Sequence, residues 1–414
     1  MAEHMPIMIG EGMIDQFIQF CKKNSFTKFL IVADFNTARV LGDAVAQAVQ
    51  QQGWDAIYHV LDPEGLHADD TTLMRVFNAY DAVPRLFVAV GSGTITDTTR
   101  FTSHRSQNQF VSFPTAASVD AYTSKVAPIT IGGLKGSIAC HSPIAIFTDL
   151  PTICASPKFL TASGFGDLIG KLTSAADWKI TQLVCGADFD EAIFASAIQA
   201  AKRAADVVDG IRETDPQSMK VLMEGQFASG FCMADFGNSA PASGAEHHIA
   251  HVWEMMFQWE KREGLFHGSA VGVAAIQSAE WYQRLRTLSR SDVEALLKST
   301  VIPSRAVQMA GLRVHLPIIA DDLIESDPIY LQLSNPKKFT QVSDRILTHW
   351  DEIKTAAAHI PSPDVISGWI NSLGGPVTTQ ELEITQAQAE TAIDYGHYLR
   401  ERFSINIIRT LFGW

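Results

Sequence analysis

Cysteine is scarce in this chain. Its 414 residues include five cysteines at wide spacing, and no C-x-x-C motif occurs among them. An odd number of widely separated cysteines argues against a disulfide framework and is typical of a reducing compartment. The opening stretch, MAEHMPIMIGEGMIDQF, also lacks the basic start and long apolar run of a secretion signal. We therefore expect a cytoplasmic protein.

Positive charge is scarce as well. The chain carries 32 Lys and Arg against 45 Asp and Glu, which gives a formal net charge of −13. An acidic chain repels nucleic acids and anionic membrane surfaces, so we expect neither as a partner. No run approaches the roughly 18 apolar residues that a membrane span requires. Any phosphate must then be bound by local backbone N–H groups or by a few placed cations.

The first third of the chain alternates apolar runs with amphipathic segments. Strands are expected over residues 28–34, 55–61, 85–94, 109–115 and 144–150, and helices over residues 38–53 and 69–82. Apolar runs separated by helices predict a parallel sheet that helices cover on both faces.

From about residue 155 the strand signal is weak and helical patterns dominate. Helices are expected over residues 158–183, 188–210, 214–228, 242–259, 266–287, 290–300 and 304–312, with several more near the end. A chain of 414 residues exceeds what a single core usually supports. We therefore expect an α/β domain over residues 1–153 and an all-α domain over residues 154–414.

A glycine-rich loop follows one of the predicted strands, in VAVGSGTITDTTRF. Gly91, Ser92 and Gly93 stand between the strand and a helix that starts near Thr94. Glycine allows close backbone approach, and a helix N-terminus offers unpaired N–H groups, so the loop suits a pyrophosphate. The motif is not G-x-G-x-x-G, and a tight strand–helix turn without a ligand stays open as an alternative.

A second polar loop follows the next strand, in FPTAASVDAYTSK, residues 113–125. Small and hydroxyl side chains after a strand's C-terminal end lie where open α/β sheets bind ligands. Asp120 lies among them. It either contacts a ligand or caps a helix, which is a common role for aspartate.

Histidines cluster in SGAEHHIAHVWE. His247 and His251 are four residues apart and share a helix face, whereas His248 points elsewhere. His267 follows in FHG, and Asp167 lies in the glycine-rich stretch SGFGDLIGK. One carboxylate and two imidazoles suit a catalytic metal with an open position. A solvated or core-satisfied histidine pair is the alternative.

Five ordered stretches carry a family resemblance: GSGTITDTTR, PTAASVDAYTS, GFGDLIGKLTSAADW, GAEHHIAH and FHG. They resemble the sn-glycerol-1-phosphate dehydrogenases, within the superfamily of iron-containing alcohol dehydrogenases, glycerol dehydrogenases and dehydroquinate synthases. The resemblance spans roughly residues 28–280, and the chain beyond about 290 matches nothing in these motifs. It implies the dehydroquinate synthase-like architecture, an α/β domain followed by a helical one, and a homo-oligomer.

The resemblance also assigns residues. Asp167, His247 and His267 match metal-ligand positions, for zinc, nickel or iron, and Asp167 thereby counts among the catalytic residues. His251 and Asp120 match positions that contact substrate, and His248 matches no ligand. The dinucleotide contacts would be Gly91, Ser92, Gly93, Thr94, Ile95, Thr115, Ala116, Ala117, Ser118 and Ser124. Asp34 matches an acid near the adenosine ribose, which favours NAD over NADP.

The function implied is a metal-dependent, NAD(P)-linked interconversion of sn-glycerol 1-phosphate and dihydroxyacetone phosphate, with hydride transfer at C2. His251 would move the proton and Asp120 would orient a terminal hydroxyl. Lys135 and Lys171 are candidates for the substrate phosphate, although solvated lysines are the simpler interpretation. A polyol dehydrogenase without a phosphate site, a dehydroquinate synthase-like cyclase and a non-catalytic nucleotide-binding relative stay open as alternatives.

Overall fold

The computed structural model describes residues 5–414, apart from the side chains of residues 134 and 135, and the chain forms two compact units. Unit 1 consists of Met1–Phe165 and Asp206–Asp235, and unit 2 consists of Gly166–Ala205 and Phe236–Trp414. The domain boundary expected after residue 153 stays a prediction. It falls inside the short helix α6, Leu150–Cys154.

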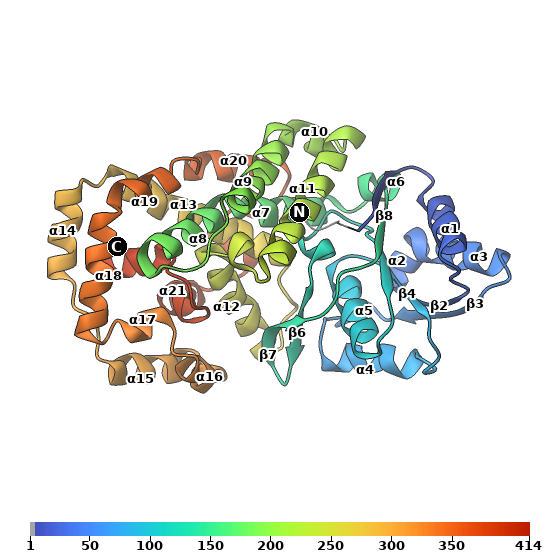
Figure 1. Cartoon of the computed structure of the whole chain (residues 1–414), viewed down its shortest axis with the longest axis horizontal. Helices are drawn as coiled ribbons and strands as arrows, with labels where there is room; N and C mark the ends of the chain where they lie inside the picture. The colour runs from blue at the N-terminus through green and yellow to red at the C-terminus, as the bar shows by residue number, and fades with distance from the viewer. Residues whose placement is uncertain (1–4) are drawn as a thin grey trace. The chain divides into compact units, whose positions relative to one another are not determined.

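A six-stranded parallel sheet forms the centre of unit 1 (Figure 1). Its order is β1-β8-β5-β4-β2-β3. The strands are β1 Ile7–Gly10, β2 Lys28–Asp34, β3 Asp55–Leu61, β4 Leu86–Val90, β5 Phe110–Phe113 and β8 Ala145–Asp149. The predicted parallel sheet is confirmed, and the short edge strand β1 was not predicted.

Helices cover both faces of this sheet. Alternate residues of β2 and β4 enter opposite cores: Phe29 and Val88 pack with α1 and α3 on one face, and Leu30 and Phe87 pack with α4 and α5 on the other. This alternation is the period of a strand that is buried on both sides. The helices are α1 Met13–Lys23, α2 Phe35–Thr37, η1 Ala38–Gly42, α3 Asp43–Gln51, α4 Asp70–Ala79 and α5 Gly93–Arg105.

A β-hairpin that was not predicted projects from unit 1. Strand β6, Val126–Ile131, pairs antiparallel with β7, Leu134–Ala139. Gly132 and Gly133 connect them with φ of 59° and 84°. Positive φ at both central residues is typical of a two-residue hairpin turn, so the Gly-Gly pair between two apolar runs was the available signal.

Unit 1 is completed by further helices from two parts of the chain. They are η2 Ala121–Thr123, α6 Leu150–Cys154, the first part of α7 Lys158–Ile169, α10 Val208–Arg212 and most of α11 Pro216–Phe236.

Unit 2 contains helices and connecting loops, and no strand among its described residues. The helices nearest the candidate site are α8 Lys171–Cys185, η3 Ala240–Ala242, α12 Ala245–Trp259 and α13 His267–Thr287. The others are α9 Glu191–Asp206, α14 Arg290–Ser299, α15 Arg305–His315, α16 Ala320–Glu325, α17 Ile329–Gln332, α18 Pro336–Thr348, α19 Trp350–Ala356, α20 Pro363–Ser372, η4 Gln380–Leu382, α21 Gln386–Tyr395, η5 Gly396–Tyr398 and α22 Ile405–Phe412. The all-helical prediction for this region is confirmed, with the long helix expected over residues 158–183 divided at Gly170 into α7 and α8.

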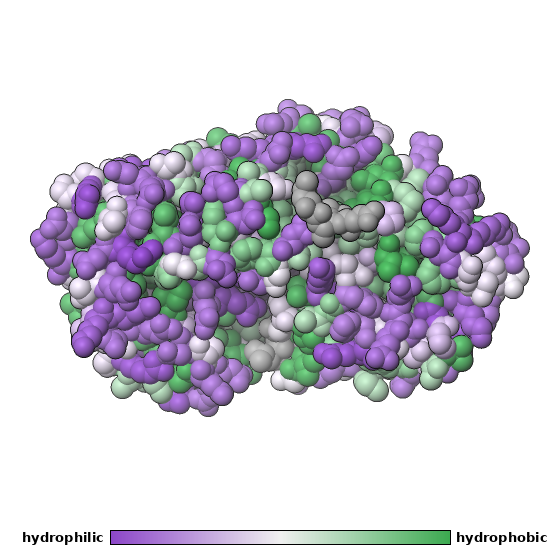
Figure 2. Space-filling model, in the orientation of Figure 1, coloured by the Kyte–Doolittle hydropathy of each residue, from purple (hydrophilic) through white to green (hydrophobic). Residues whose placement is uncertain are grey.

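Hydrophilic residues cover most of the face shown in Figure 2, and hydrophobic residues appear there in small patches. Among the described helices, none is both long enough and apolar enough to cross a membrane.

Candidate metal and nucleotide sites

Glycine brings the first candidate ligand into place. Asp167 lies in the last part of α7, directly after Gly166. A Cβ atom on residue 166 would lie 2.5 Å from the carbonyl oxygen of Gly268 and 3.3 Å from the Cα of Gly272. The backbones of α7 and α13 are therefore in direct contact at Gly166. This contact brings Asp167 close to His267, the first residue of α13. The glycine-rich motifs around both ligands thus have a packing reason.

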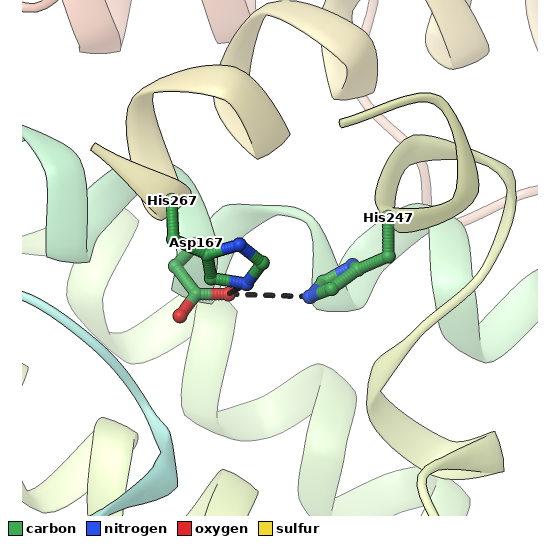
Figure 3. Close-up of side chains that lie close together, drawn as sticks. All are labelled: Asp167, His247 and His267. Carbon is green, nitrogen blue, oxygen red and sulfur yellow. Dashed lines mark ion pairs between the residues drawn. The ribbon is translucent and has the colours of Figure 1, made fainter. Parts of the chain in front are cut away.

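Asp167, His247 and His267 form one cluster, with one ligand atom from each lying within 4.8 Å of the others. The Nε2 atoms of His247 and His267 lie 3.4 Å and 4.0 Å from Asp167 Oδ1. Figure 3 shows both imidazoles directed toward this carboxylate. Asp167 is fully buried, and the His247 side chain is 7% exposed. The expected convergence of these three residues is therefore present within unit 2.

A glutamate stands behind each imidazole. Glu246 Oε1 lies 2.8 Å from His247 Nδ1, and Glu254 Oε1 lies 2.6 Å from His267 Nδ1. A carboxylate accepts a hydrogen bond, so each Nδ1 carries the proton and each Nε2 presents its lone pair to the cluster. Imidazoles that bind metals in proteins usually have such a partner. The donor set therefore fits a divalent metal ion such as zinc, nickel or iron.

Lys171 brings a positive charge to the same cluster. Its Nζ donates to Asp167 Oδ1 at 2.9 Å and to the Ala242 carbonyl at 3.0 Å, and it lies 3.4 Å from His247 Nε2. Burial opposes the charge on Asp167, but the Lys171 ammonium beside it holds the pKa of that carboxyl well below its usual range. The side chain of Lys171 is fully buried, so its interpretation as a solvated lysine is wrong.

The other two histidines of the stretch SGAEHHIAHVWE, His251 and His248, differ in their exposure to solvent. The side chain of His251 is 18% exposed, its Nδ1 lies 3.1 Å from Glu254 Oε2, and its ring stacks on that of His267 with centroids 5.3 Å apart. His248, which matches no ligand position, is fully buried. Burial and the nearby charges of Arg402 and Arg400 hold the pKa of His248 well below its usual range.

The start of α12 is anchored by a buried aspartate that the sequence did not single out. Asp177 Oδ2 accepts from Ala245 N at 2.7 Å, and Oδ1 accepts from Tyr282 OH at 2.5 Å and from Ile405 N at 2.6 Å. Ile405 begins α22 near the end of the chain. The residues beyond 290, which had no assigned role, therefore help to hold the helix that carries His247.

The candidate nucleotide site lies at the carboxyl edge of the sheet in unit 1. The chain runs outward from β2 to β3 but returns to place β4 on the other side of β2. Open α/β sheets bind ligands at such a point of reversal, outside the strand ends. Asp34 ends β2, and the Gly91–Gly93 loop follows β4. The sheet topology thus places these two predicted contacts at the carboxyl ends of neighbouring strands.

The glycine-rich loop is compatible with its central serine. Ser92 is the residue before α5 and has φ −89°, which any residue adopts. A Cβ atom on residue 91 would lie 2.6 Å from the Ile95 Cβ, so Gly91 permits the close approach of the strand to α5. The first backbone N–H groups of α5, at Gly93, Thr94 and Ile95, have no acceptor within a helix and suit an anion.

Asp34 caps a helix and keeps one oxygen available. Its Oδ1 accepts from Asn36 N at 2.8 Å and from Thr37 N at 3.0 Å. Both bonds use the same oxygen. The assignment of Asp34 to a ribose contact therefore depends on Oδ2.

The second loop is held in place from two directions. Arg100 of α5 is fully buried and donates to the carbonyls of Ala121, Tyr122 and Val126 at 2.7–3.0 Å, while it pairs with Asp97. From the other side, a Cβ atom on Gly164 would lie 1.8 Å from the Ala117 carbonyl oxygen, so α7 contacts the loop directly.

The other predicted residues of this loop are buried in unit 1. Thr115, Ala116, Ala117, Ser118, Asp120 and Ser124 are each at most 6% exposed. The Tyr122 hydroxyl donates to the Ala116 carbonyl at 2.7 Å, and Ser124 Oγ accepts from Val126 N at 3.0 Å. Asp120 accepts from the Ser229 hydroxyl at 2.6 Å and makes no helix-capping bond. Asp120 belongs to unit 1, whereas His251 and the three candidate ligands belong to unit 2.

Comparisons with known proteins agree with this architecture. A sequence model of the iron-containing alcohol dehydrogenases matches residues 8–157. Glycerol-1-phosphate dehydrogenase, NAD(P)+, of Bacillus subtilis is 30% identical over 400 residues, which cover 96% of this chain and 88% of the relative. The chain belongs to the glycerol-1-phosphate dehydrogenase family. The enzyme of the same name from Geobacillus thermodenitrificans is 29% identical over 410 residues, or 96% of this chain and 90% of the relative.

Solved structures confirm the fold. The NADH-dependent butanol dehydrogenase A of Thermotoga maritima superposes with a TM-score of 0.62 over 100% of this chain and 97% of its own, at 13% identity. Membership of the family confirms the predicted enzyme, an oxidoreductase. Because the similarity to the relatives covers 96% of the chain, it also extends past residue 290, where the motifs had indicated nothing.

Proposed function

We propose that this chain interconverts sn-glycerol 1-phosphate and dihydroxyacetone phosphate with NAD(P). In the reductive direction, hydride from the C4 of NAD(P)H adds to C2 of the ketone, one proton adds to the C2 oxygen, and NAD(P)+ leaves. The convergence of Asp167, His247 and His267, with a glutamate behind each imidazole, is the observation that carries this proposal. The names of the relatives support the substrate and the cofactor.

In this proposal the cofactor binds in unit 1. Its pyrophosphate would be held by the N–H groups of Gly93, Thr94 and Ile95, which provide local positive potential in a chain of net charge −13. Asp34 Oδ2 would accept hydrogen bonds from the adenosine ribose hydroxyls. A carboxylate there repels a 2′-phosphate, so NAD is favoured over NADP.

Asp167, His247 and His267 would hold one divalent ion, zinc, nickel or iron. Bound there, the ion supplies Lewis-acid polarisation of the C2 oxygen. The chain's own residues do the rest. Glu246 and Glu254 keep the two imidazoles oriented, and Asp120 orients the terminal hydroxyl of the substrate.

His251 moves the proton. Glu254 holds its Nδ1, so Nε2 is the atom that exchanges a proton with substrate or solvent. The side chain is partly exposed, as proton exchange requires. An imidazole suits this step because its ordinary pKa is near neutral pH.

Lys171, one of the two candidates for the substrate phosphate, donates to Asp167 and to the Ala242 carbonyl. The side chain of Lys135 lies outside the described residues. We also propose that the protein is cytoplasmic, as its few and widely spaced cysteines favour, and that it forms a homo-oligomer, as the family resemblance implies. Its acidic composition favours no binding of nucleic acid.

The direct test is NADH oxidation by metal-reconstituted protein, with dihydroxyacetone phosphate and dihydroxyacetone compared side by side. The proposal expects a strong preference for the phosphate. A preference for the free ketone would identify a polyol dehydrogenase instead, and turnover of neither would show that the substrate is another carbonyl compound.

Two substitutions separate the ligand from the proton carrier. His247→Ala should remove bound metal and activity together, because it deletes one of three ligands. His251→Ala should leave one metal ion per chain and lower kcat by about 10²–10⁴-fold, as the loss of a general acid–base does. Metal content by mass spectrometry and steady-state kinetics check both. Loss of metal in His251→Ala would contradict the assignment.

A further inference from the structure

Glu254 contacts two histidines at once. Its Oε1 lies 2.6 Å from Nδ1 of His267, and its Oε2 lies 3.1 Å from Nδ1 of His251. His251 is one turn earlier on α12, whereas His267 begins α13. A single carboxylate therefore links a candidate metal ligand on one helix to the candidate proton carrier on another.

The imidazole rings of His251 and His267 lie nearly parallel beside this carboxylate. The imidazoles of His251 and His267 stack with an interplanar angle of 18° and centroids 5.3 Å apart. Both Nδ1 atoms are directed to Glu254, so the Nε2 atoms lie on the far sides of the two rings from this carboxylate. The Nε2 of His267 lies 4.0 Å from Asp167 Oδ1, on the metal side. The side chain of Glu254 is 8% exposed, so water competes little for its oxygens.

We propose that Glu254 is a shared positioning residue, whose two carboxylate oxygens hold the metal ligand His267 and the proton carrier His251 in one fixed arrangement. The proposal rests on the proposed function for the role of His251. The proposed role of Glu254 differs from that of Glu246. Glu246 contacts one imidazole, that of His247, and its other hydrogen bonds come from the Thr173 hydroxyl and the backbone N–H of Gly244.

A second metal ion among His251, Glu254 and His267 is the competing interpretation, since the ligand atoms of these three also lie within 4.8 Å of one another. It would require His267 to bind one metal through each ring nitrogen, which an imidazole does only after losing its last N–H proton. Hydrogen bonds to a carboxylate need no such deprotonation. The positioning role is therefore the simpler chemistry for the same geometry.

The decisive variant is Glu254→Gln. Glutamine keeps the shape of the side chain, but its one carbonyl oxygen can accept from only one imidazole, and its NH₂ faces the other N–H. We expect the affinity for Co²⁺ to fall about 10- to 100-fold, as loss of a partner behind a ligating histidine does. The visible absorption of the bound Co²⁺ should change, which a merely structural defect would not cause. Glu260→Gln, an exposed position after the same helix, is the matched control and should bind Co²⁺ as the wild type does.

Kinetic measurements test the link between Glu254 and His251. At saturating metal, Glu254→Gln should lower kcat more than it changes KM. In a double-mutant cycle, adding Glu254→Gln to His251→Ala should lower kcat little further, whereas the effect on metal affinity should persist. Additive losses of kcat would overturn the link to His251.

Two results would overturn the proposal as a whole. One is wild-type affinity, spectrum and kcat in Glu254→Gln. The other is two metal ions per wild-type chain, with only one remaining in Glu254→Gln, because Glu254 would then be a ligand. Metal affinity is measured without substrate, so failure of wild-type protein to reduce dihydroxyacetone phosphate would count against the proposed function and leave this test intact.

Discussion

Lys171 adds a positive charge to the candidate metal site. Its ammonium contacts the same Asp167 oxygen toward which both histidines are directed. A unit positive charge about 4 Å from a cation costs on the order of 4 kcal/mol per charge at an effective dielectric constant near 20. The lysine therefore both keeps Asp167 ionised and opposes a second cation.

Replacing Lys171 with methionine should tighten metal binding. The side chain keeps much of its length while the competing charge is lost, so we expect the Kd for Co²⁺ to fall at least about tenfold. Metal should also raise the Tm of Lys171→Met more than that of the wild type, because the buried Asp167 has then lost its ammonium partner. Titration calorimetry and thermal unfolding measure both. Lys179→Met, on the same helix, is the control, and weaker binding in Lys171→Met would show that the lysine supports the site.

The candidate metal ligands could be predicted from their residue types, but the glutamates that orient the two histidines could not. Asp167, His247 and His267 stand in motifs with the right ligand chemistry, and they do converge. Glu246 and Glu254 were missed although both lie in the quoted stretch GAEHHIAHVWE. The spacing of three residues between His251 and Glu254 places these two on one helix face. The contact of Glu254 with His267 on α13 depends on tertiary packing and could not be predicted.

At the scale of elements, the contact of Gly166 with α13 determines where two candidate ligands meet. Gly166→Ala would place a Cβ atom 2.5 Å from the Gly268 carbonyl oxygen, which must shift. We expect about 1–3 kcal/mol of lost unfolding free energy, together with weaker metal binding. Denaturant unfolding and Co²⁺ titration test this.

Gly368→Ala is the matched control for that substitution. Gly368 lies inside α20, and a Cβ atom there meets nothing within 4 Å. Alanine should stabilise this helix by about 0.5–1 kcal/mol. Equal effects of the two substitutions would contradict the packing argument.

His397 in η5 should make the helical unit sensitive to acid. Burial, together with the charge of Arg409, lowers the pKa of His397 from 6.5 to about 3. The unfolded chain therefore takes up a proton below pH 6.5 that the folded chain refuses, and the unfolding free energy falls as the pH drops from about 6.5 toward 3. His397→Phe keeps a ring between Tyr330 and Tyr398 and removes this proton.

The check on His397 is the slope of unfolding free energy against pH. The variant should take up about one proton fewer on unfolding between pH 6 and pH 4 than the wild type, a difference of about 1.4 kcal/mol per pH unit. Identical slopes would show that His397 is protonated in the folded state.

The elements themselves were predictable to different degrees. The long apolar runs gave β2 and β3 at their observed bounds. Strand β1 has four residues and no periodicity to detect. The break between α7 and α8 at Gly170 was missed, since helical patterns continue through it. A Cβ atom there would lie 2.8 Å from Val271 and 3.3 Å from Glu246, so the reason for glycine lies in distant parts of the sequence.

For the whole molecule, the net charge of −13 opposes the approach of anionic substrates. We expect kcat/KM for dihydroxyacetone phosphate to rise as ionic strength increases from about 0.01 M to about 0.15 M, because salt screens the general repulsion. Stopped-flow or steady-state kinetics at several salt concentrations would measure it. A steep fall instead would reveal a local cationic field that dominates substrate capture.

The fold and family of the whole chain followed from ordered motifs, whereas the contribution of its last third did not. The end of the chain supplies backbone and side-chain contacts, such as that of Ile405 N to Asp177, and these carry no motif. Similarity over 96% of the chain shows that this region belongs to the family as well.

The most direct test of the central claim is a crystal structure of metal-reconstituted protein with data collected at the absorption edge of the metal. The account predicts one anomalous peak per chain, bonded to Asp167 and to the Nε2 atoms of His247 and His267, with Glu246 and Glu254 on the far sides of the two rings. A peak among His251, Glu254 and His267, or none at Asp167, would contradict it.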